Sequence, residues 1–191
     1  RLAPEHPFPA GPNDAIAAFQ GVLEHAEGLG INPRNVSVAG DSAGANLAAV
    51  VALHQDRVQL PGPKAQLLIY PGTDHNATFP SRSVLGESYF LTDRMIRWFT
   101  GHYYPETLYP EEPWNLSPLY TEQDLSNLGP TMVITAGFDP LRDEGEAYAA
   151  KLKDHGVEVH ERCYAHMMHG FMTMAGWFPS ARLVLQEIFD D

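Results

Sequence analysis

The chain has 191 residues, of which 44% are hydrophobic and 19% are charged, as is typical of one globular domain with a full core. The formal net charge of −12 argues against binding to nucleic acid or to an anionic membrane surface, because both require a basic face. No apolar run is long enough to span a membrane, and a single cysteine excludes an intrachain disulfide and a cysteine-based zinc site.

The first half of the chain predicts two helices around one strand. The opening residues, RLAPEHPFPAGP, are rich in proline and predict neither a regular helix nor a central strand. An amphipathic helix is predicted over 13–28, a short strand over 35–39 and an alanine-rich helix over 43–55.

The alternation of strand and helix continues to the end of the chain. The hydrophobic pattern predicts strands over 64–70, 131–135 and 157–163, and helices over 143–155 and 179–189. Strands that alternate with helices are typical of an α/β fold. We therefore expect a mainly parallel sheet that is covered by helices on both faces.

Residues 73–130 interrupt this alternation and are rich in aromatic side chains. These are Phe79, Tyr89, Phe90, Trp98, Phe99, Tyr103, Tyr104, Tyr109, Trp114 and Tyr120. Thr92 is a suitable N-cap for a helix over 93–103. Insertions of this length are usually functional, so we expect a lid-like segment that lines a pocket; a satellite hydrophobic cluster is the alternative.

A serine lies among small residues between a predicted strand and a predicted helix. Gly40-Asp41-Ser42-Ala43-Gly44 matches G-x-S-x-G, a weak pattern alone that its position strengthens. In a nucleophile elbow the serine occupies a strained turn, where larger neighbours would clash. The N-terminus of the helix directs N–H groups toward the site, so the Ala43 amide is a predicted oxyanion donor. We expect Gly40, Asp41 and Gly44 to support the elbow.

A serine nucleophile needs a base, and nine histidines are candidates. His169 lies in YAHMMHGFM, which is predicted to be a loop after the last strand. A loop there lies at the carboxyl edge of the sheet, on the side of Ser42. We favour His169 because Gly170 follows it and allows tight placement; His166 is the alternative.

The acid of such a site follows a strand and precedes the histidine in the chain. Asp139 comes soon after the predicted strand 131–135 and is followed by proline. We expect its carboxylate to hold the tautomer of His169. Asp143 is one alternative, although its place at a helix start is explained by capping. Asp74, one strand earlier, is the other.

Several segments resemble, in order, the hormone-sensitive-lipase-like esterases, a family of α/β-hydrolases. They are RLAPEHPFPA, GDSAGANLA, LLIYPGTD, NLSPL, FDPLRDEGEAYAAKL and HGF. The resemblance implies one α/β-hydrolase catalytic domain over 1–191, with Ser42 as nucleophile, Asp139 as acid and His169 as base. It implies a serine carboxylesterase that hydrolyses short- to medium-chain acyl esters and uses no cofactor and no metal.

One departure from the family pattern concerns the oxyanion hole. The family carries an H-G-G-G motif upstream, and no H-G-G occurs in these 191 residues. The resemblance therefore implies the C-terminal portion of such an enzyme. We expect missing N-terminal polypeptide or a second copy of the chain to cover an exposed sheet edge.

Two other functions remain open, and the missing motif favours only the first of them. The first alternative is a non-catalytic or impaired ligand-binding protein on the same fold. The second is a metal hydrolase that uses His166, His169 and Asp139, although no H-E-x-x-H motif is present.

Three further expectations concern partners, location and the lone cysteine. We expect a small apolar ester as substrate, with no nucleic acid and no membrane span. No targeting segment is visible, so we expect a cytoplasmic protein. Cys163 ends the predicted strand 157–163 and is expected to be a buried structural thiol.

Overall fold

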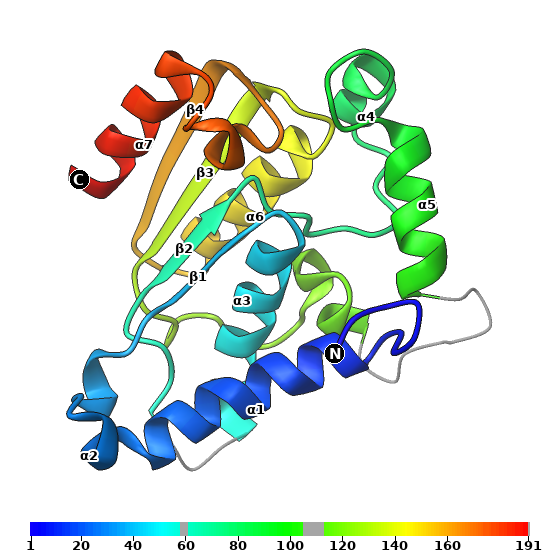
Figure 1. Cartoon of the computed structure of the whole chain (residues 1–191). Helices are drawn as coiled ribbons and strands as arrows, with labels where there is room; N and C mark the ends of the chain where they lie inside the picture. Colours follow the sequence, from blue (N-terminus) through cyan, green and yellow to red (C-terminus); the bar gives the residue numbers. More distant parts are fainter. Residues whose placement is uncertain (58–60, 105–112, 191) are drawn as a thin grey trace.

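The computed structural model describes residues 1–57, 61–104 and 113–190. Within these residues, four parallel strands form one sheet, in which neighbours in sequence are neighbours in space (Figure 1). The strands are β1 (Val38–Asp41), β2 (Gln66–Ile69), β3 (Thr131–Phe138) and β4 (Val159–Met168). The carboxyl ends of these parallel strands lie on the same side of the sheet. Ser42, Asp139 and His169 directly follow β1, β3 and β4 there.

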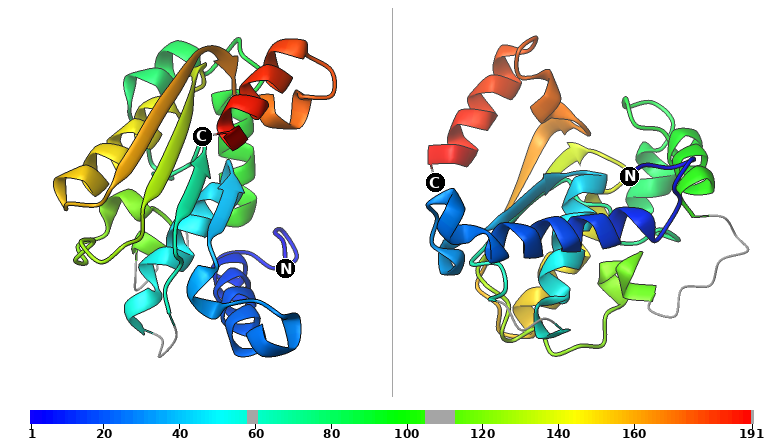
Figure 2. Two further views of the ribbon diagram at one scale, coloured as in Figure 1. Left: turned by 90° about the vertical axis from the view of Figure 1, so that its left-hand side faces the viewer. Right: turned by 60° about the horizontal axis from the view of Figure 1, so that its bottom comes forward.

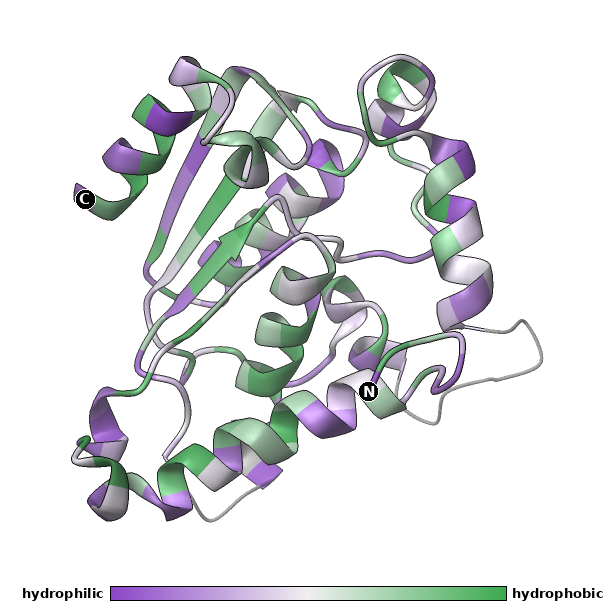
Figure 3. Cartoon of the chain, viewed as in Figure 1, coloured by the Kyte–Doolittle hydropathy of each residue, from purple (hydrophilic) through white to green (hydrophobic). Residues whose placement is uncertain are grey.

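Helices cover both faces of this sheet, which confirms the predicted α/β architecture (Figure 2). The helices are α3 (Ala43–Leu53), α6 (Arg142–Asp154) and α7 (Pro179–Asp190). Helices α3 and α6 pack on one face against Leu68 and Val133, whereas α7 packs on the other against Ile69 and Ile134. Because β2 is covered on both faces, it is hydrophobic along most of its length (Figure 3).

Two expectations for the N-terminal region are wrong, namely that the proline-rich opening contains no helical residues and that one helix spans 13–28. Helix α1 (Ala10–Glu24) begins inside the proline-rich opening, and α2 (Ala26–Leu29) follows as a separate short helix. Pro12 is tolerated because it lies in the first turn, where a backbone N–H has no partner within the helix. Gly30 ends α2 in the left-handed conformation, with φ of 68°.

All four strands differ in extent from their predicted ranges, and β3 runs to Phe138 rather than ending at residue 135. The strand predicted over 35–39 is shifted, because the Asn32 side chain caps a 3-10 turn over Pro33–Asn35. The observed strand, β1, runs from Val38 to Asp41 and ends directly before Ser42. Strand β4 continues to Met168 because it pairs along the extended β3.

The longer β4 overturns two expectations. His166 lies within the strand rather than in a loop, and His169 is the first residue after it. Cys163 is exposed, not buried. The reason is that β4 is an edge strand in the described sheet, and most of its side chains are not covered.

The described part of the insertion between β2 and β3 contains the helices α4 (Pro80–Leu85) and α5 (Asp93–Tyr103) and two 3-10 turns, Pro113–Asn115 and Pro118–Tyr120. The Thr92 hydroxyl accepts a hydrogen bond from the Met95 amide at 3.2 Å, so the predicted N-cap is confirmed. None of the residues of α5 is buried, and Trp98 is 62% exposed. Tyr109 lies outside the described residues.

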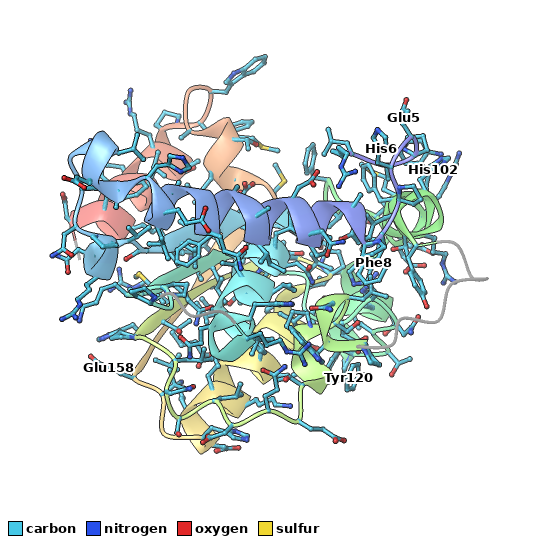
Figure 4. The ribbon with its side chains drawn as sticks, turned by 90° about the horizontal axis from the view of Figure 1, so that it is seen from below. Glu5, His6, Phe8, His102, Tyr120 and Glu158 are labelled. Carbon is cyan, nitrogen blue, oxygen red and sulfur yellow. The ribbon has the colours of Figure 1, made fainter. Side chains whose placement is uncertain are left out.

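The opening segment of the chain packs against the end of α5. The Phe8 amide donates to the Tyr103 carbonyl at 2.7 Å, and the Phe8 ring meets the rings of Tyr103 and Tyr104 edge-on. Viewed from below, His6 and Phe8 lie on the same side of the molecule as His102 of α5 (Figure 4). The residues before α1 therefore support the insertion.

A buried carboxylate of α6 ties the insertion to that helix. Glu144 is 1% exposed, and its Oε1 accepts from the amides of Thr73 at 2.9 Å and Asp74 at 3.2 Å. Its Oε2 lies 3.4 Å from Nε of Arg82 in α4. Burial raises the pKa of the Glu144 carboxyl to about 7, although Arg82 and the two amides oppose the rise.

Among the described residues, no helix has both the length and the apolar character that are needed to cross a membrane.

Candidate active site

Ser42 forms a sharp turn between β1 and α3. Its backbone has φ of 55° and ψ of −119°, a conformation that a residue with a Cβ adopts at a cost of about 1–3 kcal/mol. The Ser42 amide donates to the Ile69 carbonyl at 2.8 Å, and its carbonyl accepts from the Ala45 amide at 3.1 Å. These bonds hold the strained turn in place and leave the side chain free to point away from the sheet.

The two glycines of the motif differ in how closely the backbone approaches them. A Cβ placed on Gly40 would lie 2.2 Å from the carbonyl oxygen of Gly44, far inside a normal contact. A Cβ placed on Gly44 would point into open space. Glycine at position 40 is therefore required by the close packing of β1 on the start of α3.

This difference gives a matched test of stability. Gly40→Ala is expected to lower the free energy of unfolding by about 3 kcal/mol, the upper end of the usual range for overpacking, because the clash involves rigid backbone. Gly44→Ala is expected to leave it unchanged or raise it by up to about 1 kcal/mol, because alanine favours a helix. Urea denaturation followed by circular dichroism measures both. Equal destabilisation by the two variants would contradict this account of the elbow.

The structure brings Ser42, His169 and Asp139 into one hydrogen-bonded chain. The Ser42 Oγ lies 2.8 Å from Nε2 of His169, and Nδ1 of His169 lies 2.7 Å from Oδ2 of Asp139. When Nδ1 carries the ring proton and donates a hydrogen bond to the Asp139 carboxylate, Nε2 is unprotonated. Nε2 can then accept the proton of the serine hydroxyl. This arrangement can convert a hydroxyl into a nucleophile.

Burial fixes the two partners of Ser42. Asp139 is fully buried and His169 is 6% exposed. The second carboxylate oxygen of Asp139 accepts from the Leu141 amide at 2.8 Å, so both oxygens of the acid are occupied. His169 directly follows β4, and Gly170 after it has φ of 77°, which glycine adopts without strain.

The two alternative candidates for the acid, Asp74 and Asp143, bond to residues other than His169. Asp74 is buried, but its carboxylate accepts from the Tyr120 hydroxyl at 2.7 Å and from the Asn76 amide at 2.8 Å. Asp143 accepts from the Ser81 amide at 2.8 Å and pairs with Arg142. Both carboxylates hold the insertion in place, so neither replaces Asp139 in the hydrogen-bonded chain.

The remaining motif residues lie next to the serine. Ala43 is the first residue of α3, so its backbone N–H has no partner within the helix. The Asp41 carboxylate accepts a hydrogen bond from the hydroxyl of Tyr70 at 3.2 Å. Sequence reasoning assigned no role to Tyr70. The contact joins residues that are 29 positions apart in the chain, so no local pattern signals it.

A mainly apolar cavity of about 230 Å³ lies at the carboxyl ends of β3 and β4, and none of Ser42, Asp139 and His169 lines it. Phe138 and Met168, which directly precede Asp139 and His169, line it together with Met174. His166 also lines this cavity and is not part of the hydrogen-bonded chain. A larger cavity of about 380 Å³ is lined by residues between 77 and 97, and it likewise has none of the three hydrogen-bonded residues in its wall.

The metal-hydrolase alternative requires a cluster of ligands. Across 1–57, 61–104 and 113–190, no group of three or more histidine, cysteine, aspartate or glutamate side chains is arranged to hold a metal ion. The metal-hydrolase alternative thus gains no support from the geometry.

Comparisons with known proteins agree with the fold. A family model described as an alpha/beta hydrolase fold matches residues 1–173. The carboxylic ester hydrolase LipN of Mycobacterium tuberculosis is 46% identical over 180 residues, which cover 91% of this chain and 47% of LipN. The carboxylesterase NlhH of the same organism is 40% identical over 184 residues, covering 95% of this chain and 57% of NlhH.

Solved structures agree with the same fold. An esterase from Pyrobaculum calidifontis superposes with a TM-score of 0.90 at 40% identity, over 98% of this chain and 61% of that one. The chain spans about half the length of the curated relatives that it matches.

Proposed function

This chain belongs to the alpha/beta hydrolase fold family, in the class of the hormone-sensitive-lipase-like esterases, and on that premise we propose that it is a serine carboxylesterase. The observation that carries the proposal is the hydrogen-bonded path from the Ser42 hydroxyl through His169 to Asp139. The names of its relatives, which include a carboxylic ester hydrolase and a carboxylesterase, support the same class of reaction.

In the first step of the proposed reaction, Ser42 Oγ attacks the carbonyl carbon of the ester while its proton passes to Nε2 of His169. The Asp139 carboxylate accepts a hydrogen bond from the Nδ1–H of His169 and stabilises the imidazolium that forms. The negative charge that develops on the carbonyl oxygen is stabilised by the Ala43 amide at the N-terminus of α3.

The second half of the reaction reverses these proton transfers. The bond to the alcohol oxygen breaks, and Nε2 of His169 donates its proton to the departing alkoxide. Water then attacks the acyl group on Ser42 and gives a proton to Nε2. Collapse of this second tetrahedral intermediate releases the carboxylic acid and restores the Ser42 hydroxyl.

Short- to medium-chain acyl esters are the proposed substrates. The cavity of about 230 Å³ that Phe138 and Met168 line, one residue before Asp139 and His169, has mainly aromatic and methionine side chains in its wall. Such side chains bind apolar groups without strict shape requirements. We propose that this cavity holds the acyl group of the ester, and its volume then favours a short or medium chain over a long one. The net charge of −12 also disfavours anionic esters.

A series of p-nitrophenyl esters tests both parts of the proposal. We expect kcat/KM to be highest between the acetyl and octanoyl esters and to fall for the palmitoyl ester, because the longest chain exceeds the cavity. Mass spectrometry of the intact protein after treatment with a fluorophosphonate is expected to show one covalent adduct.

Two results would contradict the proposal in different ways. A preference for the palmitoyl ester would overturn the assigned chain length but keep the reaction. A folded protein that neither hydrolyses these esters nor forms the adduct would favour the alternative of a ligand-binding protein. That alternative is not favoured at present, because all three residues for the reaction are in hydrogen-bond contact.

A further inference from the structure

Tyr70 occupies a strained backbone position at the carboxyl edge of the sheet. It directly follows β2, and its φ of 37° lies in the left-handed region that favours glycine. Its amide donates to the Ile134 carbonyl at 2.7 Å, and its side chain is 1% exposed. Strained residues of this kind persist where the surrounding structure holds them, and they are concentrated at functional sites.

The side chain of Tyr70 touches both halves of the candidate site. Its hydroxyl donates to Oδ2 of Asp41, the residue before Ser42, at 3.2 Å. Its ring centroid lies 4.7 Å from that of the His169 imidazole, with 56° between the planes. The ring also meets Phe171 edge-on at 5.4 Å. One buried side chain thus connects the elbow of the serine with the segment that carries the histidine.

The hydrogen bonds of His169 leave one motion of its ring unrestrained. Bonds at Nε2 and Nδ1 fix two points of the imidazole, so the ring is still able to tilt about the line that joins them. An aromatic ring packed at 4.7 Å opposes that tilt and excludes water from one side of the imidazole.

The hydroxyl of Tyr70 keeps its own ring in place. Burial and the nearby Asp41 carboxylate raise the pKa of this hydroxyl above its ordinary value, while the Met172 backbone opposes the rise. The hydroxyl therefore stays protonated and remains a donor to Asp41. Because Asp41 is adjacent to Ser42, this hydrogen bond also fixes the position of the Tyr70 ring relative to Ser42.

We propose that Tyr70 is a positioning residue that holds the His169 imidazole in the orientation that reaches Ser42 and Asp139 together. The inference rests on the proposed function for its catalytic consequence. Nothing in the reaction requires Tyr70 to exchange a proton or to touch substrate.

The test compares Tyr70 with a buried tyrosine elsewhere in the core. Tyr148 in α6 is fully buried on the opposite face of the sheet, and its hydroxyl has no hydrogen-bond partner among the described residues. Tyr70→Leu and Tyr148→Leu therefore remove similar buried rings, but only the first removes a contact with His169. Tyr70→Phe keeps the ring and removes the bond to Asp41.

The first readout is the rate of covalent labelling by a fluorophosphonate, measured well below the unfolding temperature of every variant. Tyr70→Leu is expected to slow labelling by about 10- to 100-fold, as misplacement of a catalytic group does. Tyr70→Phe is expected to slow it by no more than about tenfold, the equivalent of one hydrogen bond. Tyr148→Leu is expected to label at the wild-type rate.

The second readout does not require any reaction. In proton NMR spectra, the Nδ1 proton of His169, held by Asp139, gives a far-downfield resonance that is broadened when the ring moves. We expect Tyr70→Leu to lose this resonance, and Tyr70→Phe and Tyr148→Leu to keep it. A resonance and a labelling rate that survive in Tyr70→Leu would overturn the proposal.

The two readouts separate this proposal from the proposed function. If the wild-type protein is not labelled but the resonance follows the expected pattern, the esterase assignment fails and the role of Tyr70 in holding His169 stands. Equal losses in Tyr70→Leu and Tyr148→Leu would show a general effect of core packing and would overturn the positioning role.

Discussion

Replacing Ser42 with alanine is expected to lower kcat for ester hydrolysis by about 10⁶-fold, the loss seen when a serine nucleophile is removed. The physical reason is that the acyl-enzyme requires an oxygen at this position, 2.8 Å from the base. Alanine retains a Cβ and no bulk beyond it, so the strained turn is expected to persist and the protein to fold. The measurements are ester turnover and the mass of the fluorophosphonate-treated protein, which is expected to show no adduct.

Ser83→Ala is the control for this variant. Ser83 is an exposed serine of α4 whose hydroxyl donates to the Pro80 carbonyl at 2.9 Å, outside the candidate site. The Ser83→Ala variant is expected to hydrolyse esters and to form the fluorophosphonate adduct at wild-type rates. An adduct that persists in Ser42→Ala would mean that another residue is the nucleophile, and the proposed mechanism would be wrong.

Replacing Asp139 with asparagine is expected to lower kcat by about 10⁴-fold while changing the size of the side chain very little. An asparagine amide that donates to Nδ1 favours the tautomer with the proton on Nε2. That proton blocks the nitrogen that must accept the serine proton. The loss is expected mainly in kcat, because Asp139 is fully buried and does not line a path to substrate.

Asp74→Asn is the matched control, because Asp74 is also a buried acid at the carboxyl edge of the sheet, one strand earlier. Its carboxylate bonds to Tyr120 and Asn76 rather than to a histidine. We expect stability to fall and kcat to stay within about tenfold of wild type, since only local hydrogen bonds change. A larger loss of kcat in Asp74→Asn than in Asp139→Asn would reassign the acid.

The elbow around Ser42 could be predicted because its constraints are local. A β-branched run, a serine between small residues and an alanine-rich helix are adjacent in the sequence, and the required close approach of Gly40 to Gly44 spans only four residues. The N-cap at Thr92 was predictable for the same reason, since its bond to Met95 lies within one turn.

The errors at β4 have a different cause. The length of this strand depends on the residues of β3 that it pairs with, so the sequence of β4 alone did not show that it continues past Cys163 to Met168. The exposure of Cys163 depends on the place of β4 at the edge of the described sheet. A hydrophobic pattern reports which residues tolerate burial, but not which elements are available to cover them.

The sequence by itself determined the order of strands and helices, the α/β class and the chain order of serine, acid and histidine, because periodicity and turn chemistry act over a few residues. Only the tertiary structure decided that Asp139 rather than Asp74 reaches His169, that Glu144 anchors the insertion, and that Tyr70 packs on the imidazole. These choices depend on strand register and packing between segments up to 127 residues apart, where an error of one residue turns a side chain to the other face of the sheet.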